Sequence, residues 1–104
     1  MTRDPLVASE LELVCSVLRQ HQDIESATLF GSRAKGTHSD RSDVDLALAG
    51  PLGALGAEAI AAELEELPLP YRFDVLALAA ITHTPLLEHI ERVGMVIYRS
   101  EARP

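Results

Sequence analysis

The fold of this chain is decided by residues 28–49, which read TLFGSRAKGTHSDRSDVDLALA. The short run at 26–30 is partly β-branched or aromatic and is stopped by Gly31, which predicts a buried strand followed by a turn. Residues 32–35 predict one helical turn within the polar loop that follows. The segment at 43–49 alternates at first and then becomes wholly apolar, which predicts a second strand that enters the core from a wet edge.

The rest of the chain alternates between helical and strand patterns. Ser9 and Glu12 form a capping-box pattern at the start of a helix that we expect to reach about residue 22. The further predicted elements are a helix at 57–67, a strand at 71–78, a helix at 85–92 and a strand at 95–99. This order predicts an α/β fold (α+β by some definitions) with a mixed central sheet of about four strands flanked by helices, in one domain over residues 1–104.

Composition and charge limit the classes of molecule that the chain is expected to bind. The formal net charge is -7 and aromatic residues make up only 4% of the 104 residues, so neither a basic groove nor stacking platforms for a nucleic-acid polymer are supplied. A small nucleotide remains compatible with local positive charge. The single cysteine, Cys15, falls on the apolar side of the first predicted helix, where we expect a buried small side chain. No apolar run approaches the length of a membrane span, so we expect a soluble cytoplasmic protein.

Asp43 and Asp45 are the first candidates for chemistry. They lie two residues apart on a predicted strand, so their side chains leave the same face with Cα atoms about 6.5–7 Å apart. Such a pair suits magnesium, a hard cation that binds through one or two carboxylates together with substrate phosphates. An isolated Asp-x-Asp is more often a pair of solvated residues at the start of a strand, so this pattern needs a second one beside it.

Gly31 and Ser32 supply that second pattern. A glycine directly after a strand lets a phosphate approach the backbone, and the turn that follows offers free amide groups and a hydroxyl. Arg33 and Lys35 add positive charge beside it, which suits a triphosphate. The simpler interpretation is a solvated polar loop, and the combination with the acidic pair favours the phosphate interpretation.

Asp74 lies in the middle of the third predicted strand, between apolar neighbours. A carboxylate buried there without compensation would be costly. Either Asp74 faces solvent on the open side of the sheet, or it joins Asp43 and Asp45 as a third acid that ligates metal or accepts a proton from an attacking hydroxyl. We favour the second interpretation.

Two runs, LFGSRAKG at 29–36 and SDVDL at 42–46, together resemble a family signature. They are similar to the Gly-Ser, ten residues, Asp-x-Asp pattern of the DNA polymerase beta nucleotidyltransferase superfamily. The chain looks most like the minimal nucleotidyltransferases (MNT proteins), which are antitoxins found beside HEPN-domain ribonuclease toxins. Lys35 stands where the Gly-Ser-Arg-Ala-Arg-Gly form of the motif has an arginine, which keeps the charge but loses a planar fork.

The resemblance implies a polymerase beta-like nucleotidyltransferase fold and a set of roles. Gly31 and Ser32 would hold the nucleotide phosphates, Asp43 and Asp45 would bind magnesium, as two ions, and Asp74 would be the third acid. The implied enzyme transfers AMP from ATP to a tyrosine hydroxyl of a HEPN toxin, with which it forms a hetero-oligomer, and needs no direct contact with nucleic acid or membrane.

Two alternatives stay open at this point. The chain is small and shows no separate domain for an acceptor, so an antitoxin that acts by binding and occlusion, without catalysis, fits the same length. A catalytic module for a small-molecule or RNA acceptor shares the chemistry but needs an acceptor pocket or a basic surface, which the sequence does not evidently contain.

Overall fold

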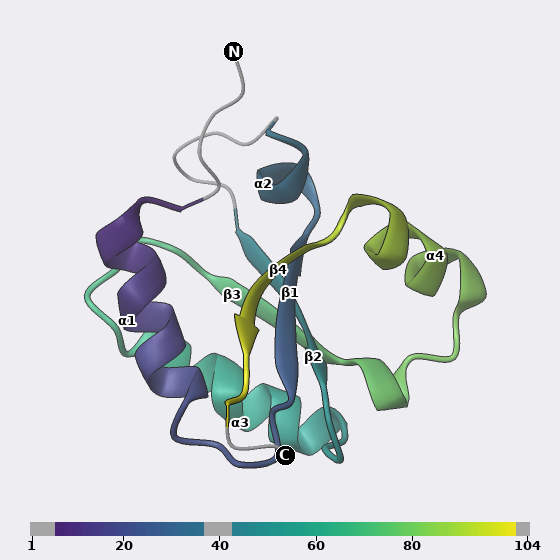
Figure 1. Ribbon diagram of the computed structural model, residues 1–104, viewed down its shortest axis with the longest axis horizontal. Helices are drawn as coiled ribbons and strands as arrows, with labels where there is room; N and C mark the ends of the chain where they lie inside the picture. The colour runs from purple at the N-terminus through teal and green to yellow at the C-terminus, as the bar shows by residue number, and fades with distance from the viewer. Residues whose placement is uncertain (1–5, 37–42, 102–104) are drawn as a thin grey trace.

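Four strands form one mixed sheet in the computed structural model, which describes residues 6–36 and 43–101, without the side chains of Ser32 and Lys35 (Figure 1). The strands are β1 (Ser26–Phe30), β2 (Val44–Ala49), β3 (Phe73–Ala77) and β4 (Met95–Arg99). Their order across the sheet is β3-β2-β1-β4. Strand β1 runs antiparallel to β2 and β4, whereas β2 and β3 are parallel.

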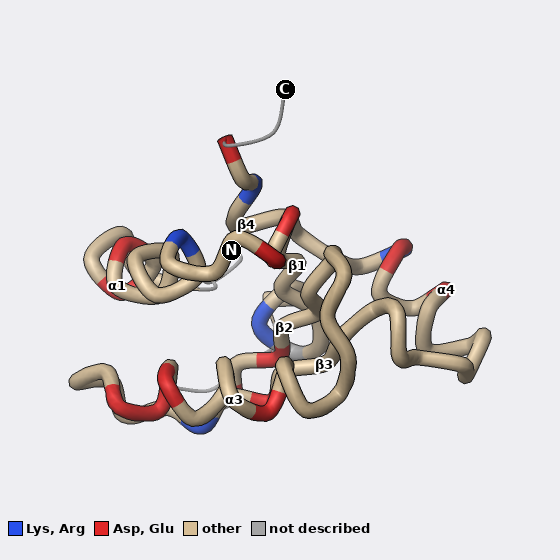
Figure 2. The backbone as a smooth tube through the Cα atoms, turned by 90° about the horizontal axis from the view of Figure 1, so that it is seen from below, with Lys and Arg blue, Asp and Glu red and all other residues tan. Residues whose placement is uncertain are grey.

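The helices lie on both faces of this sheet. They are α1 (Ala8–Leu18), the single turn α2 (Ser32–Lys35), α3 (Ala54–Glu65), the 3-10 helix η1 (Leu78–Ala80) and α4 (Thr84–Val93). Helix α3 makes the crossover between the parallel strands, since such strands cannot be joined by a tight turn. Figure 2 shows α1 and α3 on one face and α4 on the other. None of the helices within the described residues has the length and apolarity needed to cross a lipid bilayer.

The main core lies between the sheet and the pair α1 and α3. Alternate strand residues point to it, because successive side chains of a strand leave opposite faces. Those strand residues are Ala27, Leu29, Val44, Leu46, Leu48, Phe73, Val75 and Ala77. Full burial of each Leu or Phe contributes about 1.5–3 kcal/mol, so this face supplies most of the stability of a small chain. A smaller cluster under α4 is built around Phe30, Ala47 and Ile90.

The predicted fold class and mixed four-stranded sheet are confirmed, and the strands at 26–30 and 95–99 have the predicted bounds. Helix α1 is shorter than expected: it ends at Leu18 rather than near residue 22, because the chain must turn to bring the fully buried Ile24 into the core. Its predicted capping box is also wrong. The N-cap is Val7, whose backbone N–H donates to Glu10 Oε1 at 3.2 Å.

The other differences concern element ends. Helix α3 begins at Ala54, three residues before the predicted start at residue 57, with Gly53 as its N-cap and Gly56 inside the helix. Strand β3 is shorter than the predicted 71–78 because Leu78 begins the 3-10 helix. Cys15 is buried as expected.

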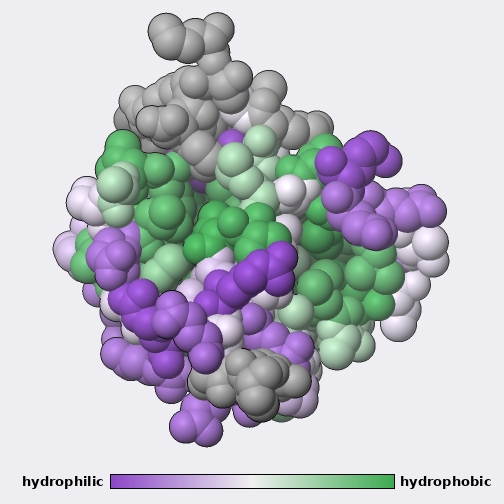
Figure 3. Space-filling model, in the orientation of Figure 1, coloured by the Kyte–Doolittle hydropathy of each residue, from purple (hydrophilic) through white to green (hydrophobic). Residues whose placement is uncertain are grey.

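Strand β4 forms one edge of the sheet and exposes apolar side chains. Met95 is 43% exposed and Val96 is 48% exposed. Figure 3 shows apolar residues gathered over β4 and beside α4. The opposite edge strand, β3, brings Asp74 to the candidate site.

Candidate active site

The sheet register places two of the three predicted acids side by side. In the parallel pair of β2 and β3, Asp45 is the partner of Asp74, so their Cα atoms lie about 4.8 Å apart. The same row continues into β1, where Phe30 is the partner of Asp45. Because Val44 and Leu46 point into the main core, Asp45 points to the opposite face, the one that carries α4.

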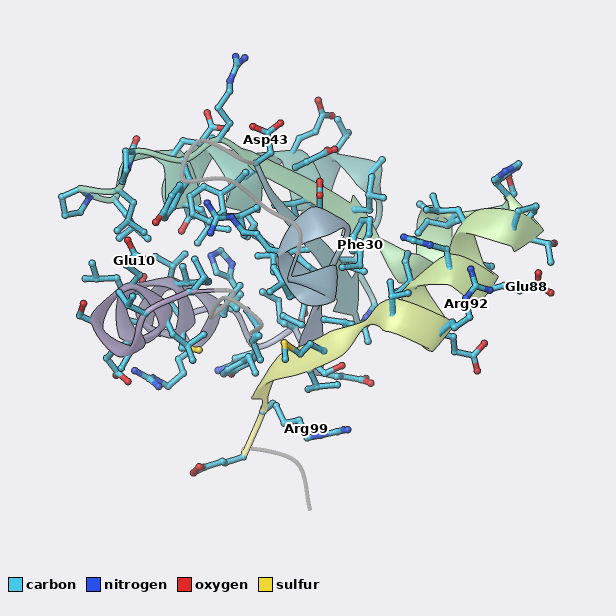
Figure 4. All side chains as sticks on the ribbon, turned by 90° about the horizontal axis from the view of Figure 1, so that it is seen from above. Glu10, Phe30, Asp43, Glu88, Arg92 and Arg99 are labelled. Atoms are coloured by element: carbon cyan, nitrogen blue, oxygen red, sulfur yellow. The ribbon has the colours of Figure 1, made fainter. Side chains whose placement is uncertain are left out.

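Asp43 is the third predicted acid. We call Asp43, Asp45 and Asp74 together the carboxylate row. Asp43 lies one residue before β2 and is exposed, so the predicted strand start at residue 43 is one residue early. In Figure 4 it lies beside α2, while Phe30 lies between α2 and α4. Asp74 is exposed, as the first interpretation expected, and it also neighbours Asp45; its role as a third acid stays a prediction.

The neighbouring acids affect the ionisation of Asp45. Burial, followed by the negative charges of Asp74 and Asp43, raises the pKa of Asp45 to about 6, from an ordinary value of 3.8. A carboxylate held in this way gains from a nearby cation, which would restore its ionised form. No three Asp, Glu, His or Cys side chains are arranged as a ready-made metal site within residues 6–36 and 43–101.

Gly31 lies directly beside the carboxylate of Asp45. It follows β1 directly and has a φ of +78°, a conformation that glycine adopts without the penalty other residues incur. A Cβ at this position would overlap Oδ2 of the Asp45 carboxylate. The turn that was predicted to take a phosphate thus lies in contact with the carboxylate row, and only glycine leaves room for both.

The other predicted phosphate contacts divide into two groups. The side chains of Ser32 and Lys35 lie outside the described residues, so their contacts stay predictions. Arg33 is described and is buried, with 3% of its surface exposed. Its guanidinium carbon lies 4.3 Å from the centre of the Tyr71 ring. Its predicted phosphate contact stays a prediction, but the side chain packs between elements and not in the open loop.

Three residues near the site were missed from the sequence. The ring of Tyr71 stacks against Arg33, and its hydroxyl donates to Oε2 of Glu10 at 2.7 Å. On the other side, the His89 ring on α4 meets Phe30 edge-on, with ring centres 6.5 Å apart. Contacts between positions so distant along the chain leave no periodic signal in the sequence.

One hollow in the described structure lies elsewhere. It has a volume of about 630 Å³ and is lined by α1 and β4, with Cys15, Arg19 and Tyr98 among its residues. None of the predicted site residues borders it. Asp43 and Asp74 lie instead at exposed positions on the β2–β3 side of the sheet.

Comparison with known proteins identifies the family of the chain. Residues 12–103 match the protein-family model described as "Polymerase beta, Nucleotidyltransferase". A Haemophilus influenzae protein named as a probable protein adenylyltransferase, MntA, is 34% identical over 96 residues, covering 90% of this chain and 83% of that protein.

Solved structures share the fold. A chain from a toxin-antitoxin crystal structure with AMP-PNP has a TM-score of 0.72 and 22% identity, covering 88% of this chain and 74% of its own length. A chain from the complex of tri-AMPylated Shewanella oneidensis HEPN toxin with MNT antitoxin has a TM-score of 0.69 and 18% identity, covering 89% and 72%.

Proposed function

The chain belongs to the polymerase beta nucleotidyltransferase family, and from that premise we propose that it transfers AMP from ATP to a tyrosine hydroxyl of a HEPN ribonuclease toxin and thereby neutralises it. The observation that carries the proposal is the register of Asp45 against Asp74, beside the Gly31 turn. A phosphate-binding turn and paired acids in contact are the two parts that nucleotidyl transfer needs. The relative named as a protein adenylyltransferase supports protein as the acceptor.

The nucleotide would bind across the turn at Gly31. Its phosphates would approach the backbone there, and the hydroxyl of Ser32 and the ammonium of Lys35 would contact them. The neighbouring fold with AMP-PNP supports an adenine nucleotide, and ATP is the proposed donor. Since ATP is the donor, the proposed reaction takes place in the cytoplasm.

Magnesium fits the donor set of the carboxylate row. Asp43, Asp45 and Asp74 offer only carboxylate oxygens, which hard cations prefer. Burial and then the charges of Asp74 and Asp43 raise the pKa of Asp45, and a bound cation would offset both effects. These three residues would hold two magnesium ions. Ions held there would supply positive charge that neutralises the phosphates of the nucleotide.

The chain's own residues then position the reaction. The turn at Gly31 orients the triphosphate so that the acceptor tyrosine oxygen attacks the α-phosphorus in line with the leaving pyrophosphate. A new O–P bond forms to the tyrosine as the bond to pyrophosphate breaks. Asp74, exposed beside Asp45, accepts the proton that the tyrosine hydroxyl loses.

The acceptor reaches this site from the open side of the sheet. No element of the described residues covers Asp43 or Asp74, and both are exposed. A tyrosine carried on a protein segment needs that freedom of approach, and it would bring its own binding surface. This supports a complex with the toxin in which the toxin completes the acceptor side of the site.

The test is a transfer assay with labelled ATP, magnesium and the HEPN protein encoded beside this chain. The wild-type chain should label the toxin on tyrosine and abolish its ribonuclease activity, and Asp43→Asn with Asp45→Asn should do neither. Asp23→Asn, at an exposed aspartate outside the site, is the matched control. Labelling that persists in the double variant would overturn the roles proposed here. Full neutralisation by that variant would show that the chain acts by occlusion.

A further inference from the structure

Arg33 stands out because its position does not suit the role that its place in the motif suggests. It lies two residues after Gly31, on the four-residue helix α2, yet only 3% of its surface is exposed. Its guanidinium is stacked over the ring of Tyr71, with 4.3 Å between the guanidinium carbon and the ring centre. A buried arginine is retained only where neighbouring groups compensate its charge, and a tyrosine face contributes to that compensation.

Tyr71 connects Arg33 to two further elements, helix α1 and strand β3. Its hydroxyl donates to Oε2 of Glu10 on α1 at 2.7 Å, and the other oxygen of Glu10 accepts from the backbone of Val7 at 3.2 Å. Burial, followed by the hydrogen bond with Glu10, raises the pKa of Tyr71, so its hydroxyl stays protonated and donates throughout the neutral range. Tyr71 itself lies three residues before Asp74, at the entrance to β3.

These contacts, from Arg33 through Tyr71 to Glu10, link α2 to the start of α1 and to the segment that leads into β3. That segment is anchored at two further points: the backbone of Phe73 donates to Glu65 Oε2 at 3.1 Å, and that of Val44 donates to the Arg72 carbonyl at 2.9 Å. A single helical turn has few hydrogen bonds of its own, so outside contacts must fix its position. Arg33 and Tyr71 provide such a contact.

We propose that Arg33 is a positioning residue, which acts through Tyr71 and Glu10 to hold the Gly31 turn against Asp45 and Asp74, and that it is not a phosphate ligand. The inference rests on the proposed function for its effect on nucleotide binding, but its structural part stands without it. Contact with a triphosphate would require the side chain to leave the Tyr71 ring and its buried site. The predicted phosphate contact of the motif would then fall to its other cation, Lys35.

Four variants separate the two roles. Tyr71→Leu removes the stacking face without touching Arg33, and Arg33→Lys keeps the charge but loses the planar group that stacks. Tyr71→Phe keeps the ring and removes the hydroxyl, which donates to Glu10. Tyr98→Leu is the matched control, because Tyr98 is the other tyrosine of the chain and also packs against the main core, from β4. Circular dichroism at the assay temperature verifies that each variant is folded.

Amide hydrogen exchange without nucleotide is the first readout. Tyr71→Leu and Arg33→Lys should each speed exchange at residues 31–36 about tenfold or more, and leave Leu46 to Leu48 in the core strand unchanged. Tyr98→Leu should leave residues 31–36 unchanged. Unaltered exchange at 31–36 in Tyr71→Leu would overturn the proposal, whatever the chain catalyses.

The second readout is the dissociation constant for AMP-PNP with magnesium, measured by calorimetry. Tyr71→Leu and Arg33→Lys should each weaken binding about tenfold, and the two changes combined should be no worse than the stronger single one, because both break the same contact. Tyr71→Phe should have a smaller effect. A phosphate ligand predicts instead that Tyr71→Leu binds as the wild type does, and this result would overturn the positioning role. If the wild-type chain fails to bind AMP-PNP, the proposed function is contradicted, and the exchange result alone decides the structural inference.

Discussion

The two faces of the sheet are built from alternate residues of the same strands, yet they carry opposite kinds of side chain. The face under α1 and α3 is apolar throughout, with Val44 and Leu46 fully buried. The face that carries α4 has Asp45 between those two residues, with Asp74 beside it, and its apolar cluster is small. Among the described strand residues, Asp45 and Asp74 lie on this second face, where we propose that the nucleotide binds.

The difference shows how a chain of this size combines stability with a strained site. One face provides the hydrophobic burial, so the other can hold repelling carboxylates that lower the free energy of unfolding. Strand β2 contributes to both faces, because its successive side chains point in opposite directions. A residue of the hydrophobic core is therefore next in sequence to one of the carboxylates. Substitutions on the two faces should therefore have separable effects on activity and stability.

The largest effect is expected on the face that carries α4. Asp45→Asn should lower the rate of AMP transfer about 10³-fold, because it removes a metal ligand and the negative charge in contact with the Gly31 turn. The thermal midpoint of the metal-free protein at pH 7.5 should stay level or rise, since one of three repelling charges is gone. Asp23→Asn should match the wild type in both measurements. A variant that lost activity only because it unfolded would contradict the separation of the two faces.

Leu46→Ala makes the opposite change one residue away. Leu46 is 0% exposed, and its truncation should cost about 2–5 kcal/mol of unfolding free energy in urea titrations. The rate of AMP transfer per folded molecule should stay within a few fold of the wild type. Leu76→Ala, on the face with α4 where Leu76 is only partly buried, should cost clearly less. Equal losses at the two leucines would refute the claim that one face supplies most of the stability.

Gly31→Ala tests the boundary between the two functions. The φ of +78° and the overlap with the Asp45 carboxylate should cost about 1–2 kcal/mol of stability and weaken AMP-PNP binding about tenfold. Gly53→Ala is the control, because Gly53 has a negative φ and nothing within 4 Å of a Cβ added there. Retention of full affinity by Gly31→Ala would mean that the turn does not hold the phosphates.

The smallest effect concerns pH. Since the folded pKa of Asp45 is raised to about 6, the folded state holds its proton more tightly than the unfolded state does. Metal-free protein should therefore lose stability as the pH rises from about 4 to about 6, by about 1 kcal/mol after solvent screening of a partly exposed group is discounted. Urea midpoints compared with those of Asp45→Asn isolate this contribution, and magnesium should reverse the loss above pH 6. Parallel pH profiles for the two proteins would rule out the raised pKa.

Much of this architecture was predictable, because periodicity reports local structure. The strand at 26–30, the helical turn at 32–35 and the strand at 95–99 were each bounded by glycine or by a clear change of pattern. The end of α1 was missed because tertiary packing of Ile24, not the composition of the helix, determines where the chain turns. The start of α3 was missed because Gly56 is tolerated inside the helix.

The candidate site divides in the same way. Asp43, Asp45 and Gly31 lie close in sequence and could be linked by spacing, and the parallel register supplied the position of Asp74 beside them. The contact of Arg33 with Tyr71 and that of Tyr71 with Glu10 join residues far apart in the chain. Such contacts depend on how the elements pack, which a single sequence does not encode in any short pattern.

The central claim is that the carboxylate row on the face with α4 binds the metal-nucleotide complex. Manganese in place of magnesium, added with AMP-PNP, allows a direct measurement by paramagnetic broadening of amide signals. The broadening should centre on Gly31, Asp45 and Asp74, spare Leu18 and Leu64, which belong to the main core on the other face of the sheet, and disappear in Asp43→Asn with Asp45→Asn. Broadening centred anywhere else, or unchanged in the double variant, would contradict the claim.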